Sequence, residues 1–494
     1  MKRKLWITLP LVLLLIVLSG CQAVGNLDVK NAMIRNLDVQ SLESNQTFSL
    51  QLTPSASASV GDRLVATMLN SSKLVIDSAK MQSATEMSLV GAVEYSGQRL
   101  PFHMYMNPDG IAINLDGAKQ PIYISTKAYE EALGLGSSLN VQLLQGKQKE
   151  FAKSVASFLF THLPNAANIS ADTVSTAVYG GETLDLTRLH IELDGQEVLQ
   201  LIKPFLTSVA ADEQGLKELI GAVYDYYAPV LTQMDTETGS YAGWGNRDEF
   251  VKEGYKTVSE GLNDLLQDYD QQIASLQSDD SFTTVFGPNT RVTTDVYFDK
   301  DLYARKQLLD VTIALPADSS YTSINLHSES EIWNVNGNVV ADPVDMSAGA
   351  LNVNPSTTPG TLLRNFDTNS PVYELLKMAG ITHKNVYVGP YSDYETITRN
   401  KVTYIAVKDL ASALDAQLEW NPSSKQVLLT DDITGAVVEL KLNSKRATVN
   451  GQVRMLPANV IHIKGTTYVP LRGAANLLNA TVNASYGDIV IERK

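Results

Sequence analysis

One stretch near the C-terminus decides the fold of that region. It reads Thr467-Tyr468-Val469-Pro470-Leu471-Arg472-Gly473-Ala474-Ala475-Asn476-Leu477-Leu478-Asn479-Ala480-Thr481-Val482-Asn483-Ala484. Its start is typical of a short strand, and the following apolar residues fall three and four positions apart, which is the spacing of one helix face. Asn479 comes after the last of them, and Asn tolerates the left-handed conformation that ends many helices. The stretch therefore predicts a strand, a helix over residues 471–478 and a second strand from Thr481.

The same pattern occurs 64 residues earlier. Residues 403–420 read Thr-Tyr-Ile-Ala-Val-Lys-Asp-Leu-Ala-Ser-Ala-Leu-Asp-Ala-Gln-Leu-Glu-Trp and align with residues 467–484 over 18 positions without a gap. A repeat of this kind indicates two copies of one structural unit, and two copies can bury the apolar faces that one copy leaves open. The motif residues of the two copies are Tyr404, Val407, Lys408, Leu414, Tyr468, Pro470, Leu471, Arg472 and Leu478.

These residues resemble the copper amine oxidase N-terminal-like domain, also called the stalk domain, over roughly residues 383–494. The likeness is specific in residues 465–472 and in the run 447–451, whereas the first repeat has Ala406 and Lys408 where the family usually has Pro and Arg. The resemblance implies an interaction or spacer module common on exported proteins of Gram-positive bacteria. The copper of the amine oxidases belongs to another of their domains, and His383 and His462 alone do not predict a copper site.

The N-terminus has the three parts of an export signal. Lys2, Arg3 and Lys4 precede an almost wholly apolar run over residues 5–18, and the run Leu18-Ser19-Gly20-Cys21 follows. A basic start, a short apolar run and small residues before a cut site are typical of a secretory signal peptide. The apolar run is shorter than the roughly 20 residues that a membrane-spanning helix needs. We expect residues 1–20 to be the signal peptide.

Residues 18–21 also resemble the lipobox of bacterial lipoproteins. The resemblance implies cleavage between Gly20 and Cys21 and a diacylglyceryl group on the sulfur of Cys21, which is the only cysteine of the chain. Residues 21–27 would then be a tether, with the protein anchored to the outer face of the cytoplasmic membrane on a Gram-positive cell surface. The alternative is an ordinary signal peptide with a chance cysteine.

The charge of the chain excludes some partners. The net charge is −15, and loss of residues 1–20 would leave 36 basic against 54 acidic residues, a net charge of −18. Nucleic-acid binding requires a basic face, so we expect no nucleic-acid partner. Adhesion to anionic lipid by charge is equally disfavoured, and the lipid on Cys21 would have to provide the membrane attachment.

The body, residues 28–340, alternates between strand-rich and helix-rich stretches. Alternating apolar residues predict strands, and apolar residues three and four apart predict helices. The predicted strands are residues 47–52, 73–77, 87–95, 101–106, 111–115, 183–193, 292–298 and 308–315; the predicted helices are residues 28–42, 127–133, 141–163, 196–235 and 247–277. Segregated runs of this sort favour an α+β fold, with a curved antiparallel sheet and helices in the body and a small α+β domain of two strand–helix–strand repeats at the C-terminus.

This element order, with a lipid anchor and a β-meander, resembles the LolA/LppX-like lipoproteins. The resemblance implies a curved sheet over helices that can hold an acyl chain. Residues 341–382 are rich in Ser, Thr, Asn, Pro and Gly and predict a linker, followed by a short helix with Ser370 as its cap, Pro371 at its first position and Gly380 at its end.

No catalytic constellation is evident. The remaining histidines, His103, His162, His190 and His327, have no metal-ligand spacing. The run 239–243 is not a Gly-x-Ser-x-Gly elbow, and the run 134–136 lacks the third glycine of a dinucleotide loop. The acidic pairs Asp279/Asp280, Asp299/Asp301 and Asp431/Asp432 are typical of solvated turns. We expect the tyrosines of residues 224–255 to serve in the packing of the body rather than in ligand binding. We predict no catalytic residue, metal or cofactor.

Three functions remain open. The first is a non-enzymatic, lipid-anchored envelope protein that binds or presents an envelope component, with the stalk domain contacting a cell-wall polymer or an envelope protein. The second is a lipid carrier, which predicts a continuous apolar cavity in the body. The third is an envelope hydrolase, which predicts a cleft with convergent polar groups and perturbed pKa values.

Overall fold

The computed structural model describes residues 23–128, 147–238, 246–355, 357–389, 392, 394, 396–485 and 488–493. The chain divides into two compact units. The body unit holds the described residues up to Ile113 together with Ile124–Val344, and the C-terminal unit holds Asn114–Tyr123 and the described residues from Asp345 onward. Both mix helices and strands, which confirms the predicted α+β class.

The largest sheet is curved, and its described neighbours pair antiparallel. Its order is β12-β6-β5-β4-β3-β2-β1-β11-β10-β9-β8-β7. The strands of its first half are β1 (Leu42–Pro54), β2 (Ser72–Ser83), β3 (Glu86–Tyr95), β4 (Gln98–Asn107), β5 (Gly110–Leu115), β6 (Ile122–Ser125) and β12 (Leu351–Val353). Those of the second half are β7 (Asn168–Ala177), β8 (Thr183–Asp194), β9 (Arg291–Phe298), β10 (Ala304–Ala314) and β11 (Tyr321–Trp333). The antiparallel meander predicted over residues 73–125 corresponds to β2–β6, which are successive neighbours in the sheet, with β2 paired to β3 and β3 to β4.

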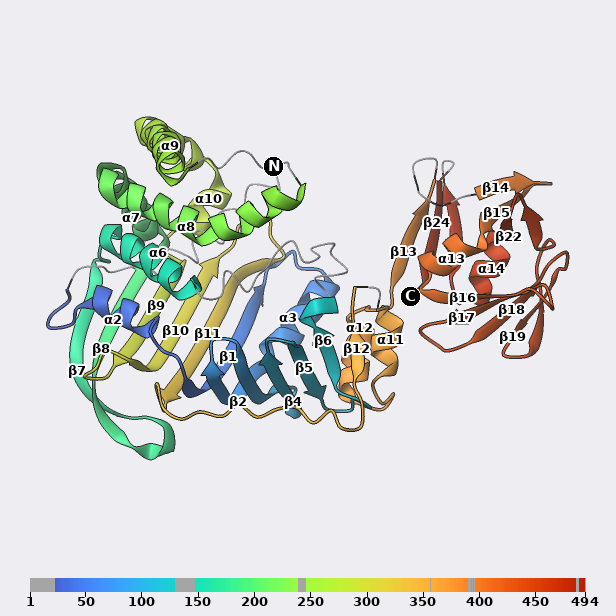
Figure 1. Cartoon of the computed structure of the whole chain (residues 1–494), viewed down its shortest axis with the longest axis horizontal. Coiled ribbons are helices and arrows are strands. Elements are labelled where there is room, and N and C mark those ends of the chain that lie inside the picture. The colour runs from blue at the N-terminus through green and yellow to red at the C-terminus, as the bar shows by residue number, and fades with distance from the viewer. Residues whose placement is uncertain are drawn as a thin grey trace. The chain divides into compact units, whose positions relative to one another are not determined.

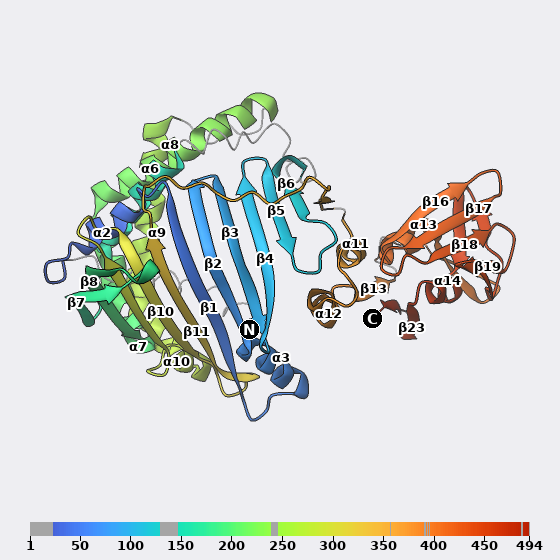
Figure 2. The same ribbon diagram turned by 90° about the horizontal axis from the view of Figure 1, so that it is seen from below.

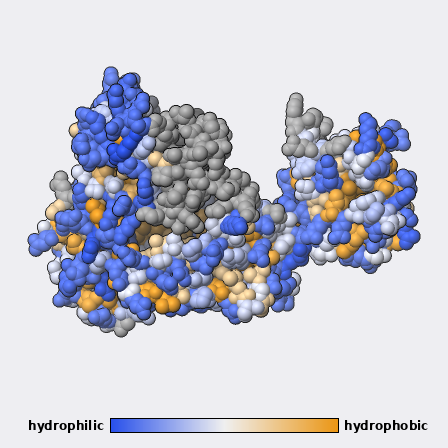
Figure 3. Space-filling model, in the orientation of Figure 1, coloured by the Kyte–Doolittle hydropathy of each residue, from blue (hydrophilic) through white to orange (hydrophobic). Residues whose placement is uncertain are grey.

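A layer of helices lies over the β7–β11 half of this sheet (Figure 1). It consists of α2 (Val29–Asn36), α6 (Gln148–His162), α7 (Gly195–Ala211), α8 (Glu213–Thr238), α9 (Arg247–Leu276) and α10 (Asp280–Val285). Hydrophilic side chains cover α9 on the face drawn in Figure 3. The apolar core of this half lies between the helices and the sheet, and Leu189, Val292 and Phe298 are among its buried residues.

The structure corrects two details of the sequence analysis. The helix predicted to reach residue 42 ends at Asn36, and Leu42 already begins β1. The helix predicted over residues 196–235 is two helices, interrupted at Asp212. Asp194 caps the first of these helices, since its side chain accepts from the backbone N–H of Glu197.

Two body helices were not predicted, α10 and α3 (Val60–Asn70). α3 begins with a capping box, in which Ser59 accepts from the backbone N–H of Asp62 at 3.1 Å and the Asp62 carboxylate accepts from the backbone N–H of Ser59 at 3.0 Å. Ser-x-x-Asp is a variant of the usual Ser-x-x-Glu signature. The hydrogen bonds from Ser59, and a further one from the Ser320 hydroxyl, lower the pKa of Asp62 below its ordinary value.

A strap formed by residues 339–344 crosses the outer face of β2–β4 after β11 (Figure 2). Asp342 pairs with Lys80 at 2.8 Å, its backbone N–H donates to the Ser88 hydroxyl at 2.9 Å, and its carbonyl oxygen lies 2.9 Å from Nε2 of His103. Val339, Ala341 and Val344 are buried. The strap therefore covers part of the polar side of the sheet.

The C-terminal unit is built on the predicted repeat. β15 (Val402–Ala406) leads into α13 (Val407–Ala413) and β16 (Ala416–Asn421); β22 (Thr466–Pro470) leads into α14 (Leu471–Leu477) and β23 (Thr481–Ser485). The two copies pack together as expected, since β15 and β22 pair antiparallel with Ile405 opposite Val469. Asn479 adopts a φ of 56°, and its counterpart Asp415 a φ of 50°, so the left-handed residue predicted to end the helix is present in both copies.

The other strands of this unit complete three small sheets around one core. They are β13 (Lys384–Val388), β14 (Thr396–Arg399), β17 (Gln426–Asp431), β18 (Val437–Lys441), β19 (Arg446–Val449), β20 (Gln452–Met455), β21 (Ile461–Ile463) and β24 (Asp488–Arg493). β24 lies between β13 and β23, and its Arg493 side chain is buried.

The segment predicted as a linker contains regular structure. It includes α11 (Pro359–Arg364), which was not predicted, and α12 (Pro371–Met378), which was. The Ser370 side chain accepts from the backbone N–H of Tyr373, and Gly380 has a φ of 68°, as the cap and stop signals predicted. α11 is tied to the C-terminal repeat region by Arg364, whose guanidinium donates to Asp432.

Candidate functional site

The sheet of the body has one apolar and one polar face. Cross-strand pairing places Leu42 opposite Met81, Met81 opposite Met87, and Met87 opposite Met106, and opposite residues point to the same side of a sheet. These four side chains form a row across β1–β4, which we call the methionine row. All four side chains are half-buried. Methionine is flexible and polarizable, and it is common at surfaces that adapt to apolar ligands.

An apolar pocket of about 480 Å³ begins where this row meets α2. Met33 and Val39 line it from the side of α2, Leu42 and Met81 from β1 and β2, and further residues from β8–β11. The latter include Ile191, Val296, Phe298, Leu309 and Ile332. Ligand pockets of proteins usually measure roughly 300–1,000 Å³ and are mostly apolar. The pocket therefore has the size and lining that suit an apolar chain.

Two of the polar side chains in the pocket wall are engaged elsewhere. The Asn36 side-chain amide donates to the carbonyl oxygen of Leu302 at 3.0 Å, and its oxygen accepts from the backbone N–H of Ala304 at 2.9 Å. The Thr294 hydroxyl donates to the carbonyl oxygen of Leu308 at 3.0 Å. Because these groups already have partners, the wall can stay in contact with an apolar chain without leaving them unsatisfied.

A second, polar pocket of about 880 Å³ borders the first at the strand ends. We call it the rim pocket. Its charged residues are Arg35, Asp38 and Lys149, and its neutral ones include Gln40, Gln82, Tyr303 and Asn336. Arg35 lies over the Tyr303 ring, 4.9 Å from its centroid, in a cation–π contact. Oδ1 of Asp38 lies 3.0 Å from Nζ of Lys149 and 2.6 Å from Nζ of Lys153.

These ion pairs make the free energy of unfolding of the body depend on pH in the acid range. Lys153 and then Lys149 lower the pKa of Asp38 from 3.8 to about 2. A carboxyl group whose pKa is lower in the folded chain than in the unfolded chain stabilises the fold at any pH above its unfolded pKa. This stabilisation is lost as the pH falls through the pKa of the folded chain. We therefore expect Asp38→Asn to lower the free energy of unfolding at pH 6, and this difference to shrink strongly by pH 2, measured by urea unfolding at pH 6, 4 and 2. A difference that stays constant across this range would contradict the assignment.

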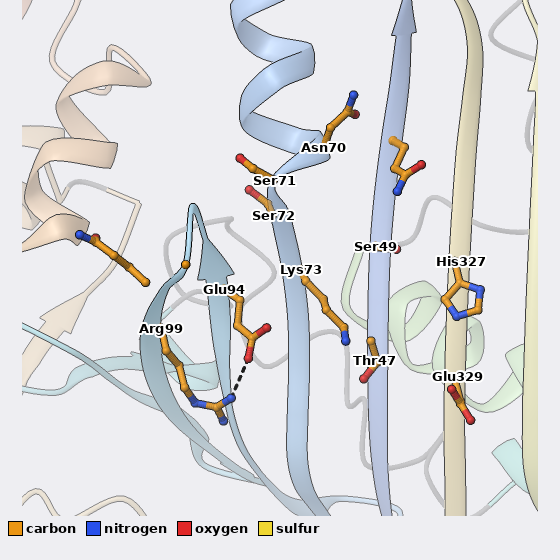
Figure 4. A pocket seen from close by; sticks show the side chains of 13 residues that line it. Thr47, Ser49, Asn70, Ser71, Ser72, Lys73, Glu94, Arg99, His327 and Glu329 are labelled. Carbon is orange, nitrogen blue, oxygen red and sulfur yellow. Dashed lines mark hydrogen bonds and ion pairs between the residues drawn. The ribbon is translucent and has the colours of Figure 1, made fainter.

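The opposite face of the sheet carries a third pocket, a polar groove of about 630 Å³ (Figure 4). Thr47 and Ser49 from β1, Lys73 from β2 and His327 from β11 line it, and Arg99 donates to Glu94 at 3.0 Å across its edge. Figure 4 shows these side chains side by side along their strands rather than converging on one point. Convergent acid, base and nucleophile groups are what catalysis requires, and the groove does not provide them.

One Ser–His–Asp arrangement occurs between helices. Nδ1 of His162 lies 2.9 Å from the Ser208 hydroxyl, and Nε2 lies 3.0 Å from Oδ2 of Asp212. In serine hydrolases Nε2 faces the serine and Nδ1 faces the carboxylate. In this protein the two ring nitrogens of His162 have the opposite partners. Asp212 also accepts from the backbone N–H of Gly215 at 2.8 Å, at the start of α8. The three residues therefore join the end of α6 to the α7–α8 junction.

The other body histidines are also bonded within the fold. Nδ1 of His190 lies 2.9 Å from Asp295, and Nδ1 of His327 lies 2.6 Å from Asp310. In the C-terminal unit, Nδ1 of His462 lies 3.1 Å from the Thr467 hydroxyl. Over the described ranges no group of three or more His, Cys, Asp or Glu side chains is arranged to hold a metal.

The predicted motif residues of the repeat separate into two classes. Seven are buried in the C-terminal unit: Tyr404, Val407, Leu414, Tyr468, Pro470, Leu471 and Leu478. Lys408 and Arg472 occupy equivalent positions in the two helices, and both are exposed. The repeat thus supplies a core and two surface cations. Gly20 and Cys21, and the runs 134–136 and 239–243, lie outside the described residues.

One acidic pair does not form the solvated turn that its sequence suggested. Asp431 and Asp432 are 0% and 1% exposed. Asp431 accepts from Arg493 at 3.1 Å, and Asp432 accepts from Arg364 and from the Thr361 hydroxyl. Their arginine partners come from β24 and α11, far away in the sequence, so adjacency alone could not reveal them.

The tyrosines that the sequence singled out pack between helices where they are described. Tyr226 stacks on Phe151 with ring centroids 4.5 Å apart, and Tyr224 lies 5.3 Å from Phe250. These contacts join α6 and α9 to α8. A separate stacked pair, Tyr179 and Trp333, has Tyr179 exposed.

Comparison with known proteins covers one part of the chain. Residues 384–491 match the family model of the copper amine oxidase N-terminal domain. No curated protein matches the chain. No helix within the described ranges is both long and apolar enough to cross a membrane.

Proposed function

We propose that this chain, whose residues 384–491 match the copper amine oxidase N-terminal domain, is a non-enzymatic binding protein of the cell envelope. Its body holds a lipophilic envelope component in the apolar pocket, and its C-terminal unit is an interaction module that contacts a cell-wall polymer or another envelope protein. A lipid on Cys21 anchors it to the outer face of the cytoplasmic membrane.

The observation that carries this proposal is the apolar pocket beside the methionine row. A filled core would be the expected state of a body that serves only as a scaffold. Instead about 480 Å³ lies among Met33, Val296, Phe298 and Leu309, within the core side of the sheet. Burial of an alkyl chain there would contribute roughly 0.8 kcal/mol for each CH₂ group, so a long chain provides enough free energy for stable binding.

A catalytic role has less support. The described groups with shifted pKa values are engaged in ion pairs, hydrogen bonds or packing, such as Asp62 in the cap of α3 and Tyr105, whose pKa is raised by the hydrogen bond that it donates to Glu86. His162 stands in the reverse orientation to a serine hydrolase. We therefore do not propose a hydrolase.

The lipophile proposal is tested by what the purified protein retains. A version that begins at Gln22 keeps every described residue and lacks the anchor, so any lipid found on it is bound non-covalently. We expect native mass spectrometry to show an added mass, and extraction with organic solvent to release an amphiphile at about one molecule per chain. A mass equal to that of the bare chain, both as purified and after incubation with a total lipid extract, would refute lipophile binding.

The anchor is tested separately at the cysteine. Cys21→Ser removes the sulfur that the lipid would modify, so we expect the protein to leave the membrane fraction or to retain residues 1–20. Fractionation and intact mass of the exported protein measure both effects. Leu18→Ile, which keeps the cysteine, is the matched control and is expected to remain membrane-bound. Unchanged membrane attachment of the Cys21→Ser variant would exclude lipidation at this residue.

A further inference from the structure

The apolar pocket and the rim pocket are neighbours, and their lining residues alternate along several segments of the chain. Seven pairs of consecutive residues have one member in each lining: Arg35/Asn36, Asp38/Val39, Val39/Gln40, Ser41/Leu42, Met81/Gln82, Tyr303/Ala304 and Val335/Asn336. These residues belong to the end of α2, to the segment that enters β1, to the ends of β2 and β11 and to the start of β10. The two pockets therefore lie side by side at the same edge of the sheet, and one has an apolar lining and the other a polar lining.

The rim pocket is locally basic in an acidic protein. The chain has a net charge of −15, yet the rim pocket is lined by two cations, Arg35 and Lys149, and by the carboxylate of Asp38, which also pairs with Lys153 outside the lining. The guanidinium of Arg35 stacks on Tyr303 and has no carboxylate partner among the described residues. Glu43, which lies on the same rim, accepts from the side chains of Asn334 and Trp333. An excess of positive charge thus remains for an anion.

Internal hydrogen bonds hold the wall of the rim pocket in place. The Asn336 side-chain amide donates to the Tyr303 hydroxyl at 3.1 Å, and its oxygen accepts from the backbone N–H of Gln40 at 2.8 Å. The Ser41 hydroxyl donates to the carbonyl oxygen of Gly337 at 2.8 Å. These hydrogen bonds fix the rim segments to one another and keep Arg35, through Tyr303, at the border between the two pockets.

We propose that the rim pocket binds the anionic headgroup, a carboxylate or a phosphate, of an amphiphile whose hydrocarbon chain occupies the apolar pocket. Arg35 and Lys149 contact the anion, while Lys153 keeps Asp38 paired. This inference rests on the proposed function, since it names the chemical class of the lipophile: an anionic lipid rather than a neutral one. Charge complementarity at the rim and the position of the rim pocket beside the apolar pocket favour this occupant.

The test uses two fluorescent probes with the same chain, one ending in a carboxylate and the other in its uncharged methyl ester. They are 11-(dansylamino)undecanoic acid and its methyl ester, titrated into the protein that begins at Gln22, with inorganic phosphate as a competitor. We expect the acid to bind roughly tenfold more tightly than the ester, since hydrogen bonds to a charged group contribute about that factor. We also expect the preference to weaken at high salt.

The variant Arg35→Gln/Lys149→Gln removes both contacts and leaves the Lys153–Asp38 pair in place. It is expected to abolish the preference for the acid and to bind the ester as the wild type does. Lys252→Gln/Lys256→Gln, which removes two exposed charges from α9, is the matched control and is expected to keep the preference.

The outcomes separate the two proposals. Equal binding of acid and ester by the wild type would overturn the headgroup assignment and leave the apolar pocket as a lipophile site. Failure of both probes to bind would overturn the proposed function itself. Displacement of the acid by inorganic phosphate at a concentration similar to that of the probe would also overturn the inference, because it would identify the rim as a phosphate site that does not need the chain.

Discussion

Arg493→Met is expected to lower the free energy of unfolding of the C-terminal unit by about 3–5 kcal/mol, because it leaves the carboxylate of Asp431 buried without its charged partner. Nη1 of Arg493 lies 3.1 Å from Oδ1 of Asp431, and the two residues are 4% and 0% exposed. Lys384 and Asp415, 2.7 Å apart, extend the ion pair into a network, and Nη2 of Arg493 lies 4.0 Å from Asp415. This network joins β24 to β13 and to the end of the first repeat.

The measurement is amide hydrogen exchange of the full chain, read on peptides from β17 and β18. Where exchange proceeds through unfolding of the unit, a loss of 3–5 kcal/mol corresponds to a rate increase of roughly 100- to 4,000-fold. Arg454→Met removes an exposed arginine of β20 and is the matched control, expected within about 0.5 kcal/mol of the wild type. Asp431→Asn combined with Arg493→Met should recover part of the loss. A cost below about 1 kcal/mol for Arg493→Met would contradict the role assigned to the pair.

Leu309→Trp is expected to weaken binding of the dansylated undecanoic acid by roughly 5- to 150-fold. Leu309 lines the apolar pocket, and an indole there takes space from the chain, which must then displace it or overpack the core at a cost of about 1–3 kcal/mol. Fluorescence titration measures the affinity, and urea unfolding checks that the body remains folded.

The neighbouring residue offers the control. Leu308 precedes Leu309 on β10, and successive side chains of a strand point to opposite faces. Leu308→Trp therefore makes the same chemical change on the outer face of the sheet, opposite Asp295 and Glu329, and should bind the probe as the wild type does. Equal affinities of the two tryptophan variants would place the chain outside this pocket.

The parts of the fold that the sequence could predict are those built from local signals. The repeat was recognisable because strand, helix and left-handed cap recur at a constant offset, and α12 because Ser370, Pro371 and Gly380 mark its two ends. The meander β2–β6 was recognisable because apolar and polar residues alternate along its strands and the strands follow one another closely. Each of these signals acts over a few residues, where backbone conformation and side-chain period are coupled.

The candidate site depends on pairings that no local signal contains. Glu43 of β1 lies opposite Trp333 of β11, and residues of α2, β2, β8, β9, β10 and β11 meet around one pocket. Apolar residues such as Val296 and Leu309 fit their strand pattern equally well in a filled core. One signal was present but not used: Met81, Met87, Met104 and Met106 cluster in three successive strands, and methionine in such numbers is typical of adaptable binding surfaces.

The position of β1 between β2 and β11 has a consequence for how the chain acquires its structure. β2–β4 can form a meander with β1 soon after synthesis, because those pairings join close neighbours in the sequence. The other edge of β1 stays open until residues 321–333 have been made, and pairings of such high contact order form slowly. During that interval the edge presents unpaired N–H and C=O groups to any strand nearby. The nascent body is therefore most prone to aggregate at β1, and a chaperone that shields this strand would have its greatest effect before β11 emerges.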